Sequence, residues 1–399
     1  MHESWRWFGP NDPVTLAEIR QTGATDIVSA LHDIPIGEVW PRAAIAAHKG
    51  LIEASNDTMS PLRWTVVESI PVHEDIKLAA PGHEKYVDNW IATLEHLAAN
   101  GIKTICYNFM PVIDWTRTDL KHRLPNGAYT LRFDQDKFAA FDLFILERAN
   151  AQDDYTKNEV DRADRVFNSM TSEEKTELTR TIIAGLPGRM TDAYTLDDFR
   201  MALARYDHMD HAALRKNLLA FLARVLPYAE QANVKLAIHP DDPPWDMFGL
   251  PRIICTPADL DLLFSEAPSP ANGMTLCVGT YGSRPDNNLP QMALDFAERI
   301  YFSHLRGVTR DPQEPRSFYE ASHLDSDIDM IAVIRELLNE EARRKREAPE
   351  LDGIFIRPDH GLQMMDDIEK SGNPGYSGIG RLKGVAEIRG VIRALSAQN

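Results

Sequence analysis

Four residues of metal-ligand type stand at or near the ends of four apolar segments in the second half of the chain. His239 ends VKLAIH, Cys277 lies in MTLCVG, His304 lies in IYFSHLR, and Asp359 follows GIFIR. Two imidazoles, a thiolate and a carboxylate form a credible set of four ligands for a divalent transition metal. Taken singly, such a cysteine is usually a small core residue, and such a histidine often makes only hydrogen bonds. The recurrence at four successive segments predicts a metal site.

Residues beside these positions suggest how a substrate is held and how its protons are moved. Arg306 lies two residues beyond His304, so on a regular strand both side chains face the same side, and a guanidinium can hold a carboxylate with two hydrogen bonds. His360 directly follows Asp359, and Tyr376 lies in the glycine-rich GYSGIGR. An imidazole and a phenol are suitable for general acid–base catalysis. Tyr376 on its own is more often a structural aromatic residue of its loop.

The elements that must position these residues are eight short apolar segments, rich in β-branched and aromatic residues. Such continuous apolar runs, alternating with segments of helical periodicity, are typical of a parallel sheet covered by helices. Eight of them predict a (β/α)8 barrel, in which the strand ends converge on one catalytic face. A doubly wound sheet is the alternative, but no GxGxxG follows the first segment. The expected strands are residues 5–8, 26–31, 63–69, 103–110, 234–239, 274–279, 300–306 and 353–357.

The stretch of residues 115–205 is too long for one loop and one helix. It contains FAAFDLFILERAN, then a polar run in which Thr171 and Glu174 have the spacing of a helix capping box. We interpret it as a helical insertion after the fourth strand, because no linker composition separates it from the rest. The predicted organisation is one barrel domain over residues 1–399.

Composition limits the classes of partner. The chain has 399 residues, 43% of them hydrophobic, which allows a large buried core. A net charge of −17 disfavours nucleic acid and membrane surfaces as partners, because an acidic surface repels phosphates. With three cysteines, no signal peptide and no apolar run of membrane-spanning length, we expect a cytoplasmic protein. A homodimer is the expected oligomer, since it is the commonest one.

Several motifs carry a family resemblance that spans nearly the whole chain. In order they are WRWFGPND, LHDIPIGEVW, AIHPDDPP, LCVGT, FSHLRG, RPDHG and GYSGIGR. Together they resemble the mannonate dehydratase family. The resemblance implies a xylose-isomerase-like (β/α)8 barrel, Mn2+ or Fe2+ as cofactor, and catalysis by His360 and Tyr376. The metal ligands that it implies are His239, Cys277, His304 and Asp359. The substrate contacts that we expect are Trp7, Asp241, Arg306 and His323.

The implied reaction is the dehydration of D-mannonate to 2-keto-3-deoxy-D-gluconate and water in hexuronate (glucuronate) catabolism. A base would take the C2 proton, an acid would protonate the departing C3 hydroxyl, and a Lewis acid would stabilise the enediolate. Three alternatives remain open. A sugar or sugar-acid isomerase on the same barrel would favour harder oxygen ligands, and an endonuclease is disfavoured by the net charge of −17. A non-catalytic sugar-acid binding protein has no need of a metal set beside a histidine and a tyrosine.

Overall fold

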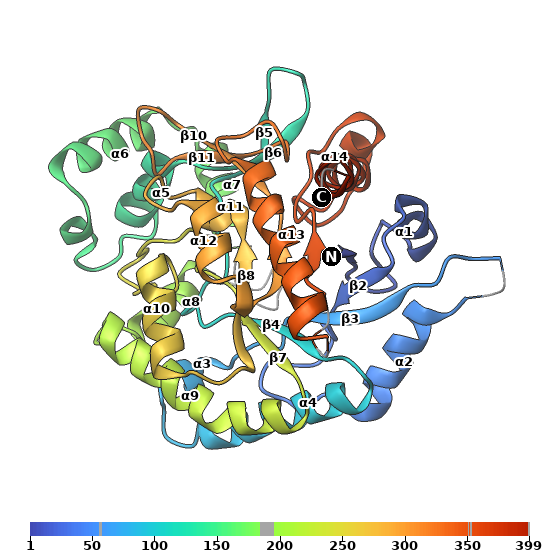
Figure 1. Ribbon diagram of the computed structural model, residues 1–399. Coiled ribbons are helices and arrows are strands. Elements are labelled where there is room, and N and C mark those ends of the chain that lie inside the picture. Colours follow the sequence, from blue (N-terminus) through green and yellow to red (C-terminus); the bar gives the residue numbers. More distant parts are fainter. Residues whose placement is uncertain (56–57, 184–194, 350, 352, 398–399) are drawn as a thin grey trace.

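A closed barrel of eight parallel strands forms the centre of the computed structural model (Figure 1). The strands pair in the order β1-β12-β9-β8-β7-β4-β3-β2, so the first strand also pairs with the last. Each of the eight predicted segments contributes one strand, which confirms the barrel. The described residues are 1–55, 58–183, 195–349, 351 and 353–397. The barrel strands are β1 (His2–Arg6), β2 (Asp26–Ser29), β3 (Arg63–Glu68), β4 (Thr104–Tyr107), β7 (Lys235–Ile238), β8 (Asn272–Cys277), β9 (Ile300–His304) and β12 (Phe355–Arg357).

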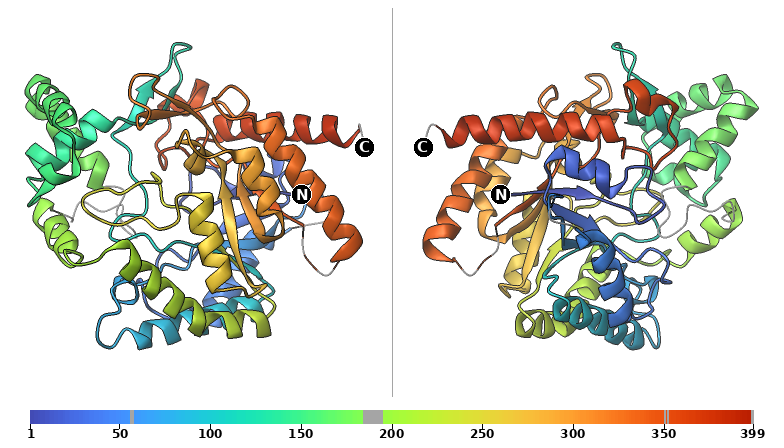
Figure 2. Two further views of the ribbon diagram at one scale, coloured as in Figure 1. Left: turned by 60° about the vertical axis from the view of Figure 1, so that its left-hand side comes forward. Right: turned by 90° about the vertical axis from the view of Figure 1, so that its right-hand side faces the viewer.

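Helices follow the barrel strands and cover the outside of the sheet. In α4 the residues Val87, Trp90, Ile91, Leu94 and Leu97 recur at helical spacing and are all buried. The last helix, α14, packs beside the first, α1, next to β1 (Figure 2). The covering helices are α1 (Leu16–Thr22), α2 (Arg42–Glu53), α4 (Glu84–Ala99), α9 (His211–Gln231), α10 (Pro257–Glu266), α12 (Leu289–Asp295), α13 (Met330–Glu347) and α14 (Gly378–Ser396). The short helices between them are α3 (Glu74–Lys77), α11 (Val278–Gly282), η3 (Ala297–Arg299) and η4 (Met365–Glu369).

The barrel interior is filled by side chains, so the strands form a packed core rather than a pore. Buried hydrophobic residues from all eight strands belong to the core clusters. Since every strand here is parallel, all of their carboxyl ends lie at one end of the barrel. One buried cluster inside the barrel consists of Val28, Val66, Cys106, Ala237, Tyr301, Phe302 and Phe355.

The long insertion follows β4, the fourth barrel strand, as expected, but it is not helical throughout. It begins with a hairpin, β5 (Asp119–Arg123) and β6 (Tyr129–Phe133), which joins β10 (Gly307–Arg310) and β11 (Phe318–Ala321). The four strands form an accessory sheet in the order β10-β11-β6-β5. The expectation of a helical insertion did not include this hairpin, because β6 pairs with β11, a strand far away in the sequence. The sequence of the insertion alone does not indicate pairing with such a distant strand.

The remainder of the insertion is helical where the structure describes it. The capping box is present: the Thr171 N–H donates to the Glu174 carboxylate at 2.8 Å, and the Glu174 N–H donates to the Thr171 hydroxyl at 3.2 Å. Residues 184–194 of the insertion lie outside the described residues. Its helical segments are α5 (Gln135–Ala140), the π-helical turn η1 (Phe141–Ile145), η2 (Ala151–Asp154), α6 (Lys157–Ser169), α7 (Ser172–Ile183) and α8 (Leu196–Ala204).

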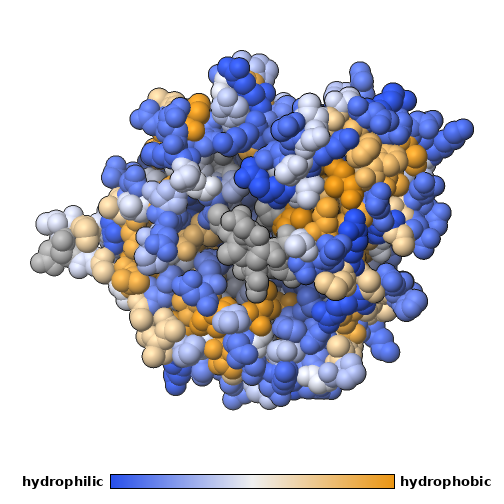
Figure 3. Space-filling view, turned by 180° about the vertical axis from the view of Figure 1, so that it is seen from behind, coloured by the Kyte–Doolittle hydropathy of each residue, from blue (hydrophilic) through white to orange (hydrophobic). Residues whose placement is uncertain are grey.

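A chain with a net charge of −17 is expected to have a polar surface. The face in Figure 3 is largely hydrophilic, with apolar residues in separate areas. In the part of the chain that the structure describes, no helix is both long enough and apolar enough to cross a bilayer.

Candidate active site

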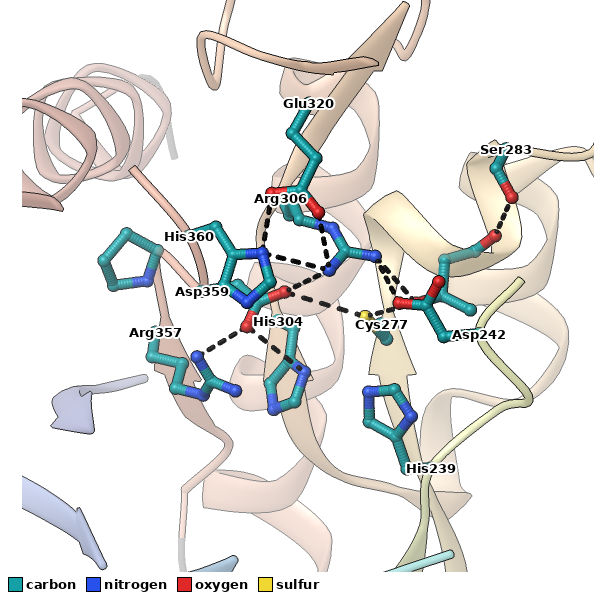
Figure 4. Close-up of polar contacts among 12 residues, drawn as sticks. His239, Asp242, Cys277, Ser283, His304, Arg306, Glu320, Arg357, Asp359 and His360 are labelled. Carbon is teal, nitrogen blue, oxygen red and sulfur yellow. Dashed lines mark hydrogen bonds and ion pairs between the residues drawn. The ribbon is translucent and has the colours of Figure 1, made fainter. Parts of the chain in front are cut away.

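Three of the expected metal ligands meet at the carboxyl ends of neighbouring strands. His239 directly follows β7, Cys277 ends β8, and His304 ends β9. Cys277 and His304 are register partners on adjacent strands. One ligand atom from each of the three residues lies within 4.8 Å of the other two (Figure 4). The barrel topology therefore gathers a thiol and two imidazoles, and we call these three residues the ligand trio.

The chemistry of the trio fits a divalent metal. Both ring nitrogens of His304 are buried without a hydrogen-bond partner among the described residues, and buried polar atoms are rarely left unpaired in a native protein. The Nδ1 of His239 lies 2.7 Å from the Pro240 carbonyl. That contact favours the tautomer with a proton on Nδ1 and a lone pair on Nε2, as in a metal-ligating histidine. Burial lowers the pKa of His239 against the opposing effect of nearby carboxylates, which keeps the imidazole neutral.

Asp359, the fourth expected ligand, borders the trio. Its Oδ1 lies 3.8 Å from His304 Nδ1, and its Oδ2 lies 3.9 Å from Cys277 Sγ. The carboxylate also contacts Arg357 at 2.5 Å and Arg306 at 3.1 Å. Burial alone would raise the pKa of Asp359, but these cations outweigh it and hold the pKa well below its usual range. Asp359 therefore presents an ionised carboxylate beside the trio.

The structure also brings His360 and Tyr376 together. Their ring centroids are 4.9 Å apart in an edge-to-face arrangement. The two loops are tied by a hydrogen bond of 2.8 Å from the Gly361 N–H to the Gly375 carbonyl. Gly375 has a φ of +83°, and a Cβ there would lie 2.7 Å from the His360 ring, so this close approach requires glycine. Burial raises the pKa of Tyr376 despite neighbouring arginines, so the phenol stays protonated near neutral pH.

Arg306 lies in the site with its guanidinium already among carboxylates. Its Nη2 is 2.9 Å from Asp242, and its Nη1 is 3.1 Å from Asp359 and 3.5 Å from Glu320 (Figure 4). Strand β9 ends at His304, so the expected regular-strand relationship does not extend to Arg306. Arg306 reaches the site from the connection between β9 and β10.

Three residues of this network were missed from the sequence. Arg117 is fully buried and joins Asp242, at 2.8 and 3.2 Å, to Glu320, at 2.8 and 3.1 Å. The doubled aspartate of HPDDPP is a visible signal for Asp242. Arg117 and Glu320 belong to the insertion and to the accessory sheet, where neither periodicity nor a motif marks them.

Comparison with known proteins decides the family. A model of the D-mannonate dehydratase (UxuA) family matches residues 1–399. The chain belongs to the D-mannonate dehydratase family. Its members are hydro-lyases, and the family is metal-dependent, in agreement with the candidate metal site found here. The resemblance read from the motifs is thus confirmed.

Individual members of the D-mannonate dehydratase family match along their whole length. The chain is 52% identical to mannonate dehydratase from Chromohalobacter salexigens, over 99% of both chains. It is 51% identical to mannonate dehydratase from a Marinomonas species, over 100% of both. The crystal structure of mannonate dehydratase from Streptococcus suis serotype 2 superposes with a TM-score of 0.76 at 34% identity, covering 100% of this chain and 95% of that one.

Asp241 is one of the expected substrate contacts in this member of the D-mannonate dehydratase family, but its carboxylate makes hydrogen bonds within its own loop. Its carboxylate accepts the N–H groups of Ile253 at 2.7 Å and Ile254 at 2.8 Å, and it lies 3.6 Å from the Arg252 guanidinium. Two buried N–H groups thus depend on this side chain, which holds the loop after β7 together. The neighbouring Asp242, rather than Asp241, contacts the arginines of the site.

His323 and Trp7 lie close to the site's framework. His323 is buried, and its Nε2 lies 2.6 Å from the carbonyl of Pro358, the residue before Asp359. Trp7 is buried directly after β1, at the end of the barrel where the site lies, with its ring centroid 5.4 Å from that of His48. His323 is thus a neighbour of the loop that carries Asp359, and Trp7 belongs to the barrel wall at the same end.

Another buried carboxylate stands at the end of β3. Glu68 contacts Arg6 at 2.8 Å and Arg357 at 2.9 Å, and it lies 3.6 Å from His304 Nε2. Nearby, His32 stacks on the ring of Phe8, with centroids 5.7 Å apart. Desolvation of the ring by its neighbours, together with the charge of Arg6, lowers the pKa of His32 to about 4, although the residue as a whole is exposed. His32 is therefore a neutral imidazole at neutral pH.

Proposed function

We propose that this chain dehydrates D-mannonate to 2-keto-3-deoxy-D-gluconate and water, with His360 and Tyr376 carrying the proton transfers. Membership of the family supports the reaction. The observation that carries the assignment of roles is the meeting of the two rings, 4.9 Å apart, beside the ligand trio, in which the His304 nitrogens have no hydrogen-bond partner among the described residues.

The ligand trio and Asp359 would hold the metal, which we propose to be Mn2+ or Fe2+. When bound, the metal supplies Lewis-acid stabilisation of negative charge on the substrate's carboxylate and C2 oxygen. The trio provides a thiol and two imidazoles within 4.8 Å, and Asp359 adds an ionised carboxylate at its border. Imidazole, thiolate and carboxylate ligands suit a first-row transition metal.

We assign the base to His360 and the acid to Tyr376. The Nδ1 of His360 lies 2.6 Å from a carboxylate oxygen of Glu320, which favours a proton on Nδ1 and leaves the lone pair on Nε2 to take the C2 proton. Tyr376, whose raised pKa keeps it protonated, suits donation to the departing C3 hydroxyl. The C2 proton and the C3 hydroxyl are lost, water is formed, and the resulting enol becomes the 2-keto product.

Arg306 and Trp7 are our proposed substrate contacts. Arg306 is a buried cation of the site, so it can orient a sugar-acid carboxylate or hydroxyl while Asp242 and Asp359 hold its guanidinium. Trp7 offers an apolar wall next to β1. His323 supports the same end of the site through the Pro358 carbonyl at 2.6 Å.

We also propose that the protein works in the cytoplasm as a homodimer of single-domain chains. The free, buried cysteines support a reducing compartment, since a thiolate ligand at Cys277 must stay reduced. The insertion shares the accessory sheet with β10 and β11, which supports one domain over residues 1–399. The homodimer is proposed because homodimers are the commonest oligomers.

The direct test is to strip the purified protein with a chelator, reload it with Mn2+ or Fe2+, and incubate it with D-mannonate. We expect 2-keto-3-deoxy acid to form only after reloading. An isomerase would instead convert the sugar acid without loss of water, and a binding protein would leave it unchanged. Either of those results overturns the proposal.

A further inference from the structure

Glu320 contacts His360 in a defined way. It lies on β11 of the accessory sheet and is 3% exposed. One carboxylate oxygen, Oε2, lies 2.6 Å from His360 Nδ1 (Figure 4). Burial on its own would raise the pKa of Glu320, but His360, Arg306 and Arg117 outweigh it and lower the pKa to about 2. An ionised carboxylate can only accept hydrogen bonds, so the partner nitrogen must carry the proton.

The other oxygen of Glu320 is held by Arg117. The Nε and Nη2 of Arg117 donate to Oε1 at 3.1 and 2.8 Å, and Arg306 approaches the same oxygen at 3.5 Å. Arg117 is completely buried, and its guanidinium also contacts both oxygens of Asp242. The two oxygens of Glu320 therefore have different partners, arginine on one side and the His360 ring on the other. The carboxylate is fixed in this orientation.

The first part of the insertion builds this arrangement. The hydroxyl of Thr130 on β6 donates to the Glu320 backbone carbonyl at 2.7 Å. Tyr129 and Gln363 exchange two backbone hydrogen bonds, of 2.9 and 2.8 Å. The hairpin β5–β6 thus contacts both the strand that carries Glu320 and the segment three residues beyond His360. Arg117 lies two residues before the same hairpin.

We propose that Glu320 is the positioning residue of His360, selecting the Nδ1–H tautomer, and that Arg117 from the insertion fixes Glu320 for this task. The proposal rests on the function assigned to His360 above. It gives the insertion a role in catalysis, because the insertion supplies both Arg117 and the strand beside Glu320. A histidine that acts as base through Nε2 needs its proton on Nδ1, and a carboxylate there secures both the tautomer and the ring orientation.

The substitution Glu320→Gln separates positioning from simple packing. A glutamine has nearly the shape of glutamate but one oxygen and one NH2 group. Arg117 can only donate, so it draws the amide oxygen to its own side and turns the NH2 group toward His360 Nδ1. His360 would then accept at Nδ1 and carry its proton on Nε2, which is the wrong tautomer for the base. Glu320→Ala removes the carboxylate but brings no amide donor to the ring, whose remaining contact at Nδ1 is Arg306 Nη1 at 3.4 Å.

Kinetics of the metal-loaded protein supply the first measurement. We expect Glu320→Gln to lower kcat about 10²-fold, as for a misplaced catalytic group, with a much smaller change in KM. The loss in Glu320→Gln should equal or exceed the loss in Glu320→Ala. A Glu320→Gln variant that is milder than Glu320→Ala, or close to the unsubstituted protein, overturns the proposal. Asp142→Asn is the matched control, since it makes the same change at a buried carboxylate of the insertion whose partners are Arg148 and Tyr155; its kcat should not change.

NMR of protein labelled with 15N-histidine supplies a measurement that does not depend on activity. The two ring nitrogens of His360, assigned by their loss in His360→Asn, should report a proton on Nδ1 in the unsubstituted protein and on Nε2 in Glu320→Gln. An unchanged tautomer overturns the positioning role even if kcat falls. If His360→Asn retains full turnover, the function proposed for His360 fails instead, and the NMR result still shows separately whether Glu320 controls the ring. Thermal melts of each variant confirm that the compared proteins are folded.

Discussion

Asp241 and Asp242 are neighbours in the chain, yet their carboxylates hold different parts of the molecule. Asp241 accepts the N–H groups of Ile253 and Ile254, at 2.7 and 2.8 Å, within its own loop. Asp242 contacts Arg306 at 2.9 Å and, through Arg117, the accessory sheet. The first aspartate stabilises the loop after β7, and the second belongs to the charged network of the site.

Substitution of each aspartate should therefore affect a different property. Asp241→Ala leaves two buried N–H groups unpaired, so the free energy of unfolding should fall by about 1–3 kcal/mol for each, while kcat of the folded enzyme changes little. Asp242→Asn should lower kcat more than it lowers stability, because Arg117 and Arg306 lose a shared anion. Denaturant titration and steady-state kinetics measure both. A loss of turnover in a stable Asp241→Ala protein would return Asp241 to the substrate site.

Removal of either proton-transfer group should abolish most turnover while the metal stays bound. General acid–base groups contribute about 10²–10⁴-fold each, and we expect losses of that size in His360→Asn and Tyr376→Phe. Exchange of the substrate C2 proton with solvent should persist in Tyr376→Phe and disappear in His360→Asn. Tyr228→Phe, which changes a tyrosine that is 41% exposed, is the control. If both variants keep more than about a tenth of kcat, the pair is wrong.

The metal prediction concerns Cys277. Serine is a poor soft ligand, so Cys277→Ser should bind less Mn2+ or Fe2+, measured as metal per chain after dialysis, and should keep the thermal stability of the metal-free protein. Cys255→Ser is a matched control, since that buried thiol contacts Asp241 at 3.6 Å and is not part of the trio. Equal metal content in the two variants would remove Cys277 from the ligand set.

Arg306→Lys tests the proposed substrate contact. An ammonium cannot reproduce a planar guanidinium that faces Asp242 and Asp359 together. Loss of a charge-assisted hydrogen bond costs about 1.5–3 kcal/mol, so kcat/KM should fall roughly 10- to 100-fold. Arg310→Lys, at an arginine paired with Asp327, serves as control. A kcat/KM in Arg306→Lys equal to that of the control would leave Arg306 with a structural role only.

The lowered pKa of His32 predicts that the protein loses stability in mild acid. Its pKa is about 4 in the folded protein, against about 6.5 in an unfolded chain. Between pH 6.5 and 4 the unfolded chain therefore binds more protons than the folded one, and stability falls as the pH is lowered through this window. His32→Gln should reduce this dependence, measured by denaturant titration from pH 7 to 4, and the control His208→Gln, at a second exposed histidine, should not. An identical pH dependence in both variants would contradict the neutral state of His32.

The places of the proposed metal ligands and proton-transfer residues in the fold could be predicted because they depend on local features. Each barrel strand is a short apolar run that is recognisable without its partners, and parallel strands in a barrel must end on the same side. His239, Cys277 and His304 follow from that rule alone. His360 follows from its place beside Asp359, and Tyr376 from its glycine-rich loop.

Other parts of the site depend on contacts between distant segments. The β6 strand pairs with β11, so the hairpin in the insertion was not predicted. Glu320 and Arg117 are ordinary charged residues in the sequence, and they gain a role only where the accessory sheet places them 2.8 Å apart. The choice between Asp241 and Asp242 likewise depends on which carboxylate meets buried N–H groups and which meets arginine.

The amino-acid sequence by itself determined the barrel, the family and the residues at the strand ends, because apolar periodicity and short motifs are properties of neighbouring residues. Only the tertiary structure decided which charges pair in the buried site. An ion pair of buried groups depends on distance and desolvation, and both are set when segments some 200 residues apart, such as those of Arg117 and Glu320, pack together.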